Sequence, residues 1–82
     1  MIRELDMVVL TCDVPEHGLK QGDVGTAVLV HKGGGYTVEF LALNGDTVAL
    51  VTLARRQIRP VRRREVANAR RLASTSVSRG AS

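Results

Sequence analysis

The stretch Gly33–Leu53, GGGYTVEFLALNGDTVALVTL, decides the fold because it contains two strand patterns and two turn signals. Tyr36–Phe40 alternates strictly between apolar and polar side chains, which is the pattern of a half-buried strand. Asn44-Gly45 is among the strongest short hairpin signals, and it leads into the β-branched, apolar segment Thr47–Leu53, a further strand. The three glycines before Tyr36 allow the positive φ angles of a tight hairpin. The stretch therefore predicts strands joined by short turns.

The flanking sequence adds three more strands. Val24–His31 enters the glycine hairpin, and Met7–Cys12 is a β-branched, apolar first strand. The intervening segment Pro15–Asp23 carries two glycines and a proline, which indicates a long loop. Gln57–Val61 is a short last strand whose proline suits a sheet edge. Five short strands in this order, without a helical period, predict an all-β, five-stranded SH3-like barrel.

Charge divides the chain into two parts. Residues 1–61 hold six basic and seven acidic side chains, whereas residues 62–82 hold six arginines against Glu65 alone. The net charge of +4 therefore comes from the C-terminal part. We expect residues 1–61 to form the barrel and residues 62–82 to form a basic tail. Good helix formers predict a short helix over residues 62–73, and the patternless residues 74–82 predict disorder.

Composition excludes several classes of protein. Cys12 is the only cysteine, so no intramolecular disulfide can form. A structural zinc site takes four ligands, and the chain offers only Cys12, His17 and His31, so we expect no metal and no cofactor. No apolar run approaches the ~20 residues of a membrane span, and the N-terminus carries charge where a signal peptide needs apolar residues. We expect a soluble, cytoplasmic protein.

Several of these segments also carry a resemblance to a known family. They are the run from Glu4 to Leu10, the block DVPEHGLKQGDVGT from Asp13 to Thr26, and the segments Tyr36–Phe40, Thr47–Leu53 and Gln57–Pro60. Over about residues 3–61 the chain resembles the bacterial family called domain of unknown function 4926. The resemblance implies an SH3-like barrel. Some members resemble the smaller partner of two-gene modules of the toxin–antitoxin kind, which implies protein binding, and nothing is implied for the basic tail.

Two features in and after the long loop contain residue types that take part in chemistry. Gly22–Thr26 superficially resembles a phosphate loop, but a strand rather than a helix follows it. We therefore predict that Asp23 caps a turn through local backbone hydrogen bonds. His17 lies beside Glu16 and near Asp13, which could form an acid–base pair, although we favour a histidine held within the turn.

The fourth strand carries the clearest functional signal, because both of its faces are apolar. A small barrel standing alone needs one apolar face per strand, and each fully exposed Leu or Val forfeits roughly 1.5–3 kcal/mol of burial. Either a protein partner, which includes a second copy of the chain, or the folded-back tail would cover the extra face. The alternative is that these side chains are the scattered exposed apolar residues that soluble proteins normally carry. The residues we predict at such an interface are Ala49, Val51, Leu53, Tyr36 and His17.

The leading hypothesis is thus a non-enzymatic protein-interaction module that binds through the outer face of its sheet. An alternative is a weak, sequence-independent nucleic-acid binder, because clustered arginines suit phosphate groups. A second alternative is an oligomeric enzyme whose site lies in a shared pore, although one chain shows no convergent catalytic set. We predict no catalytic residue and no small-molecule ligand. The candidate phosphate contacts are Arg62, Arg63, Arg64, Arg70 and Arg71.

Overall fold

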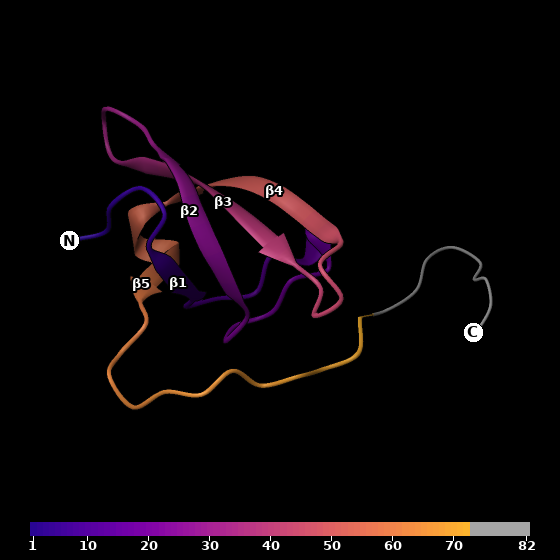
Figure 1. Ribbon diagram of the computed structural model, residues 1–82. Helices are drawn as coiled ribbons and strands as arrows, with labels where there is room; N and C mark the ends of the chain where they lie inside the picture. The colour runs from indigo at the N-terminus through magenta and orange to yellow at the C-terminus, as the bar shows by residue number, and fades with distance from the viewer. Residues whose placement is uncertain (73–82) are drawn as a thin grey trace.

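Five strands and two short 3₁₀ turns make up the computed structural model, which describes residues 1–72 (Figure 1). All five strands lie where the sequence predicts them, and their bounds differ from the predicted ones by at most a few residues. The elements in chain order are β1 (Met7–Leu10), η1 (Pro15–His17), β2 (Val24–Val30), β3 (Gly35–Leu41), β4 (Thr47–Ala54), η2 (Arg55–Gln57) and β5 (Ile58–Pro60).

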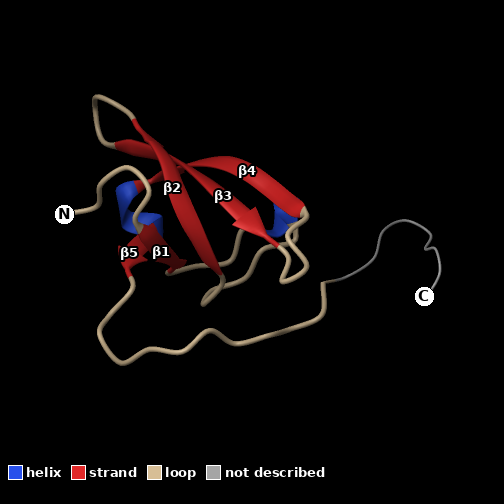
Figure 2. Ribbon diagram, viewed as in Figure 1, coloured by secondary structure: helices blue, strands red, loops and turns tan. Residues whose placement is uncertain are grey.

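The strands form one antiparallel sheet in the order β4-β3-β2-β1-β5. Figure 2 shows how strongly this sheet twists and curls over its inner face. A long loop joins β1 to β2, and the turn η2 precedes β5. This connectivity confirms the predicted SH3-like barrel, and it leaves β4 and β5 as the edge strands.

The predicted turns form for the predicted reason. Gly33 and Gly34 have φ angles of 95° and 104°, and Gly45 has a φ of 97°, which residues with a Cβ rarely adopt. The β1–β2 loop folds back on itself through a bridge between Val14 and Leu19. The loop therefore forms an ordered wall at one end of the barrel.

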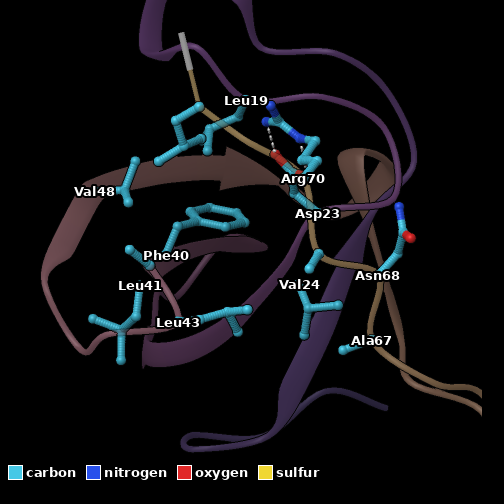
Figure 3. A pocket seen from close by; sticks show the side chains of 13 residues that line it. Leu19, Asp23, Val24, Phe40, Leu41, Leu43, Val48, Ala67, Asn68 and Arg70 are labelled. Carbon is cyan, nitrogen blue, oxygen red and sulfur yellow. Dashed lines mark hydrogen bonds and ion pairs between the residues drawn. The ribbon is translucent and has the colours of Figure 1, made fainter. Parts of the chain in front are cut away.

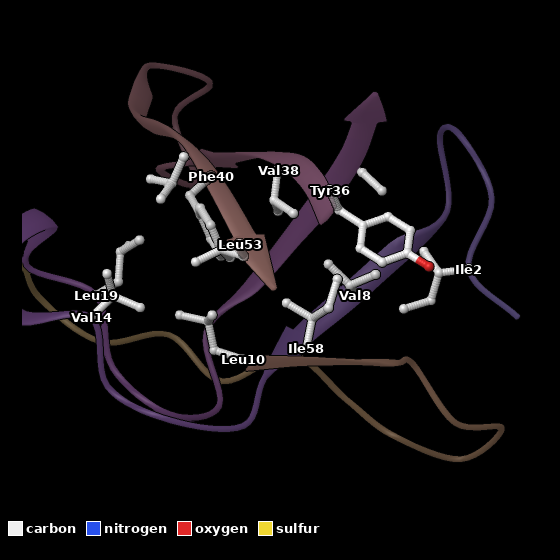
Figure 4. Close-up of a cluster of buried hydrophobic side chains, with 12 residues drawn as sticks. Ile2, Val8, Leu10, Val14, Leu19, Tyr36, Val38, Phe40, Leu53 and Ile58 are labelled. Carbon is white, nitrogen blue, oxygen red and sulfur yellow. The ribbon is translucent and has the colours of Figure 1, made fainter. Parts of the chain in front are cut away.

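The core lies inside the curled sheet. Its side chains come from all five strands, from the β1–β2 loop and from the segment before β1, and they converge as Figure 4 shows. Gly25 on β2 is part of this packing, because a Cβ at this position would come within 2.7 Å of Val38 and 2.9 Å of Phe40. The buried cluster consists of Ile2, Val8, Leu10, Val14, Leu19, Ala27, Tyr36, Val38, Phe40, Val51, Leu53 and Ile58.

Residues 61–72 form an irregular segment, which we call the strap, and it runs across the base of the barrel (Figure 1). The predicted helix over residues 62–73 is therefore wrong for the part that the structure describes. An isolated helix of this length is marginal in water, and two ion pairs described below hold the strap against the barrel instead. Residue 73 and the predicted disorder over residues 74–82 lie outside the described residues. Within residues 1–72 no helix is long and apolar enough to cross a membrane.

Candidate protein-binding groove

A groove of about 310 Å³ opens on the barrel between the β1–β2 loop and the β3–β4 hairpin, and the strap lies along it (Figure 3). Residues 67–70 and Leu72 of the strap contribute to its lining. The barrel side of the groove is mainly apolar, with side chains from the loop, from β2, and from β3, β4 and their connection: Leu19, Val24, Phe40, Leu41, Leu43 and Val48.

The floor of the groove is part of the core, whereas its rim faces solvent. Phe40 and Leu19 are 2% and 3% exposed, and the Phe40 ring lies at the centre of the labelled side chains in Figure 3. On the rim, Leu41 is 51% exposed and Leu43 is 86% exposed. Large apolar side chains are therefore presented to solvent beside an apolar floor, which is the usual character of an interaction site.

A β-bulge places Val48 in the groove. Phe40 of β3 pairs with Ala49 of β4, but the next residue, Leu41, pairs with Thr47. Val48 is the extra residue on β4, and a bulge re-aims the side chain at that position. Val48 consequently packs against the core cluster and lines the groove beside Phe40.

Asp23, at the end of the β1–β2 loop, binds the strap through an arginine. The Arg70 Nε donates to Oδ1 of Asp23 at 2.8 Å, and its Nη2 donates to Oδ2 at 2.5 Å and to the Gly18 carbonyl oxygen at 3.1 Å. The Asp23 carboxylate also accepts the Lys20 N–H at 2.9 Å, which orients it towards the groove. A two-bond pairing of guanidinium and carboxylate is directional as well as charged.

The charges of this pair reinforce each other. Partial burial of the Asp23 carboxyl tends to raise its pKa, but the hydrogen bonds from Arg70 and from the Lys20 N–H outweigh this and hold the pKa below its usual value. In turn, the hydrogen bond to Asp23, with the nearby charge of Asp13, raises the pKa of the Arg70 guanidinium. Both groups are therefore ionised at neutral pH, and the pairing is between full charges.

A second ion pair fixes the start of the strap. Arg59 on β5 donates from Nη1 and Nη2 to the two carboxylate oxygens of Glu65 at 2.9 and 2.7 Å. The Arg62 N–H donates to the same carboxylate at 2.5 Å. These hydrogen bonds lower the pKa of Glu65 to about 2, and the bond from Arg59 has the largest effect. The strap is thus held at Glu65 and again at Arg70.

The family model that matches the chain covers residues 4–60 and is described as a domain of unknown function (DUF4926). The chain belongs to the DUF4926 family. This confirms the resemblance drawn from its strands and from the Asp13–Thr26 block. No curated protein and no solved structure matches the chain.

The DUF4926 match divides the groove between two parts of the chain. It ends at residue 60, so it contains Asp23, Phe40, Leu43 and the rest of the barrel wall. The strap, with Arg70 and Leu72, lies outside the match. The barrel side of the groove therefore lies within the residues that match the family, whereas the strap lies outside them.

Sequence reasoning found one role of Asp23 and missed the other. The predicted turn cap is present, because the Asp23 carboxylate accepts the Lys20 N–H. The ion pair with Arg70 was not predicted, since it joins residues 47 positions apart and no local pattern reports such a contact. The unequal charge of barrel and tail is the only sequence signal that favours an acidic partner for an arginine of the tail.

Four of the predicted interface residues are wrong. Val51, Leu53 and Tyr36 belong to the buried core, and Ala49 is half-buried against it. The cause is the register between β3 and β4. The β4 residues pair with core-facing residues of β3, for example Leu53 with Tyr36. Residues that pair across two strands lie on the same face of the sheet. The outer face of β4 instead presents Leu50, which is 61% exposed.

The remaining candidates lie at the surface. His17 is exposed in η1, and among the described residues no cluster of three or more His, Cys, Asp or Glu side chains is arranged to hold a metal ion. Arg70 is engaged by Asp23, so its guanidinium is not free for a phosphate group. The other predicted phosphate contacts are exposed: Arg62, Arg63, Arg64 and Arg71.

Proposed function

We propose that this DUF4926 protein is a non-enzymatic protein-interaction module that binds an extended segment of a partner protein in the groove. The leading hypothesis from the sequence is kept, but the binding surface moves from the outer face of the sheet to the groove. A role as the smaller partner in a two-gene module remains a prediction.

The observation that carries the proposal is that a segment without regular secondary structure, the strap, already lies along the groove. The strap crosses an apolar floor formed by Phe40 and Leu19, and it is bound there by a side-chain ion pair at Asp23. Exposed Leu41 and Leu43 beside it supply further apolar surface that a longer or better-matched segment could cover. A shallow, apolar groove with one directional polar contact is suited to peptide recognition.

The proposal is tested by selecting peptides from a random displayed library with the purified full chain and measuring the affinity of the best peptide. Leu43→Asp should weaken its binding by at least tenfold, because losing about 1.5 kcal/mol of burial corresponds to that factor. Leu50→Asp is the matched control, since Leu50 is also exposed but lies on the outer face of β4. It should leave the affinity unchanged.

Two results would contradict the proposal. One is a selection that enriches no peptide. The other is a selected peptide whose affinity is unaffected by Leu43→Asp but lost in Leu50→Asp, which would return the binding surface to the outer face. Chemical-shift mapping of the complex gives an independent check, because the largest changes should fall at Leu19, Phe40 and Leu43.

Nucleic-acid binding by the tail is retained as a second candidate function. The observation that favours it is that three consecutive arginines, residues 62–64, are exposed on the strap. Because Arg70 is paired with Asp23, the available contacts are at most these three and Arg71 among the described residues.

A further inference from the structure

We infer that the groove recognises an arginine followed two positions later by an apolar residue in an extended segment of a partner protein, and that Arg70 and Leu72 occupy this site in cis. The inference rests on the proposed function and adds to it the chemistry of the ligand. The strap then has a second role, because it competes with the partner for the groove.

The polar end of the site is shaped for a guanidinium. Two carboxylate oxygens of Asp23 and the Gly18 carbonyl oxygen accept three hydrogen bonds from one side chain. A guanidinium presents several N–H donors in a plane, whereas an ammonium is a compact point charge that cannot form the same paired contact. Asp13 adds negative charge close to this position. The site therefore favours arginine over lysine.

The apolar end of the site holds the residue two positions after the arginine. Leu72 lines the same groove as Leu19 and Val48 and is 36% exposed, whereas Val66 on the same strap is 90% exposed. Arg70 and Leu72 both line this groove, whereas Arg71, between them, does not. The spacing of the two contacts thus defines a short arginine–any residue–apolar pattern.

The strap is attached in a way that allows exchange. Within the described part of the chain, the backbone atoms of residues 66–72 make no hydrogen bond to the barrel, and the Arg70 side chain supplies the polar contacts of this stretch. Residues 67–69 are exposed. A partner that offers the same two side chains, together with surface for Leu41 and Leu43, can therefore replace the strap without opening any strand pairing.

Charge complementarity identifies the occupant as a basic segment of a partner protein. The barrel carries a small net negative charge over residues 1–61, and its groove ends at Asp23 with Asp13 nearby. The occupant seen in the groove is itself part of an arginine-rich segment. A second copy of the chain could present its own strap in exchange, and the experiment below includes that outcome.

The test uses the full chain and a synthetic peptide that copies residues 67–72, with both ends blocked. Arg70→Gln should release the strap, and Arg71→Gln is the matched control because it removes the same charge from the neighbouring residue. The strap has an effective concentration of about 1 mM, so for a peptide with a Kd on the order of 0.1 mM the intact strap weakens binding about tenfold. Titration calorimetry or chemical-shift titration measures the affinity for each protein.

We expect the peptide to bind Arg70→Gln about five- to tenfold more tightly than it binds the unaltered chain or Arg71→Gln. Lysine in place of the first arginine of the peptide, or serine in place of its leucine, should weaken binding to Arg70→Gln at least fivefold. Adding Asp23→Asn to Arg70→Gln, in which the strap no longer competes, should also weaken peptide binding at least fivefold relative to Arg70→Gln alone. Because the peptide variants leave the protein unchanged, the conclusion does not depend on the folding of Asp23→Asn.

Equal affinity for the three proteins, or equal binding of the arginine and lysine peptides, overturns the inference. If library peptides bind at Leu43 without any dependence on arginine, the inference fails while the proposed function stands. If no peptide of any sequence binds, both fail. A dimer of the unaltered chain that dissociates on Arg70→Gln in sedimentation equilibrium would show that the occupant is a second copy, and would overturn the assignment of a partner protein.

Discussion

Gly25→Ala should destabilise the barrel strongly, although it adds only one methyl group. A Cβ at this position would lie 2.7 Å from Val38 Cγ1, 2.9 Å from Phe40 Cδ1 and 2.9 Å from the Glu39 carbonyl oxygen. Rotation of a side chain cannot relieve the contact with the backbone oxygen. Overpacking of this kind costs about 1–3 kcal/mol, and the backbone contact places Gly25→Ala near the upper end.

Part of this cost is offset in the unfolded chain. Alanine restricts the unfolded state and so stabilises the folded one by about 0.4–1 kcal/mol, which leaves a net loss of about 2 kcal/mol. For a domain of this size 1 kcal/mol shifts the Tm by about 4–8 °C, so we expect the Tm to fall by about 8–16 °C. Because Phe40 forms the floor of the groove, its displacement should also weaken peptide binding.

The measurement is thermal and urea unfolding followed by far-UV circular dichroism, since the chain has no tryptophan. Gly35→Ala is the control, because the nearest atoms to its added Cβ lie at 3.6 and 3.9 Å, which are ordinary contacts. It should match the unaltered chain or be slightly more stable. Equal stability of the two variants, within about 0.5 kcal/mol, would refute the packing argument for Gly25, because that is the scatter expected of substitutions without a structural effect.

Three further predictions concern the ion pairs, the core and the tail. The Glu65 carboxyl should titrate with a pKa of about 2 rather than 4.5. Its interaction with Arg59 therefore stabilises the fold fully above pH 4.5, and this stabilisation is lost as the pH falls through about 2. Arg59→Gln should raise the pKa of Glu65 in a carboxyl NMR titration, and an unchanged pKa would count against the pairing. Val51→Asp should abolish folding, as measured by circular dichroism, because Val51 is 8% exposed in the core and a buried unpaired charge costs several kcal/mol. Leu50→Asp should stay folded. A folded Val51→Asp together with an unfolded Leu50→Asp would show that the faces of β4 are misassigned. If the tail binds nucleic acid through four arginines, the slope of log K against log salt concentration should be about −3.6. Changing residues 62–64 to glutamine leaves one arginine, so the slope should then be only about −0.9. Equal binding before and after the change would exclude this function for residues 62–64.

Local patterns were sufficient to predict the strands and turns. The strict alternation of Tyr36–Phe40 and the positive φ angles required at Gly33, Gly34 and Gly45 are properties of a few neighbouring residues. Such signals act within the chain segment that carries them, so they can be recognised before any tertiary contact is known. The same holds for the turn at Asp23, whose cap joins residues three positions apart.

The assignment of faces on β4 could not be made from β4 alone. Both of its faces are apolar, and period-two alternation gives two equivalent choices until a register is known. The pairing of Leu53 with Tyr36 and of Val51 with Val38 resolves the choice, because the face of Tyr36 and Val38 is the buried one. Combining the β3 pattern with the Asn44-Gly45 turn would have given the same answer from the sequence.

The sequence by itself determined the five strands, their turns, the family and the concentration of positive charge after residue 61. Only the tertiary structure decided that Arg70 meets Asp23 and that the strap lies along an apolar groove rather than forming a helix. The physical reason is distance along the chain. Strand and turn preferences act among neighbouring residues, whereas the ion pair and the groove exist only after the barrel has brought the β1–β2 loop, the β3–β4 hairpin and the strap together.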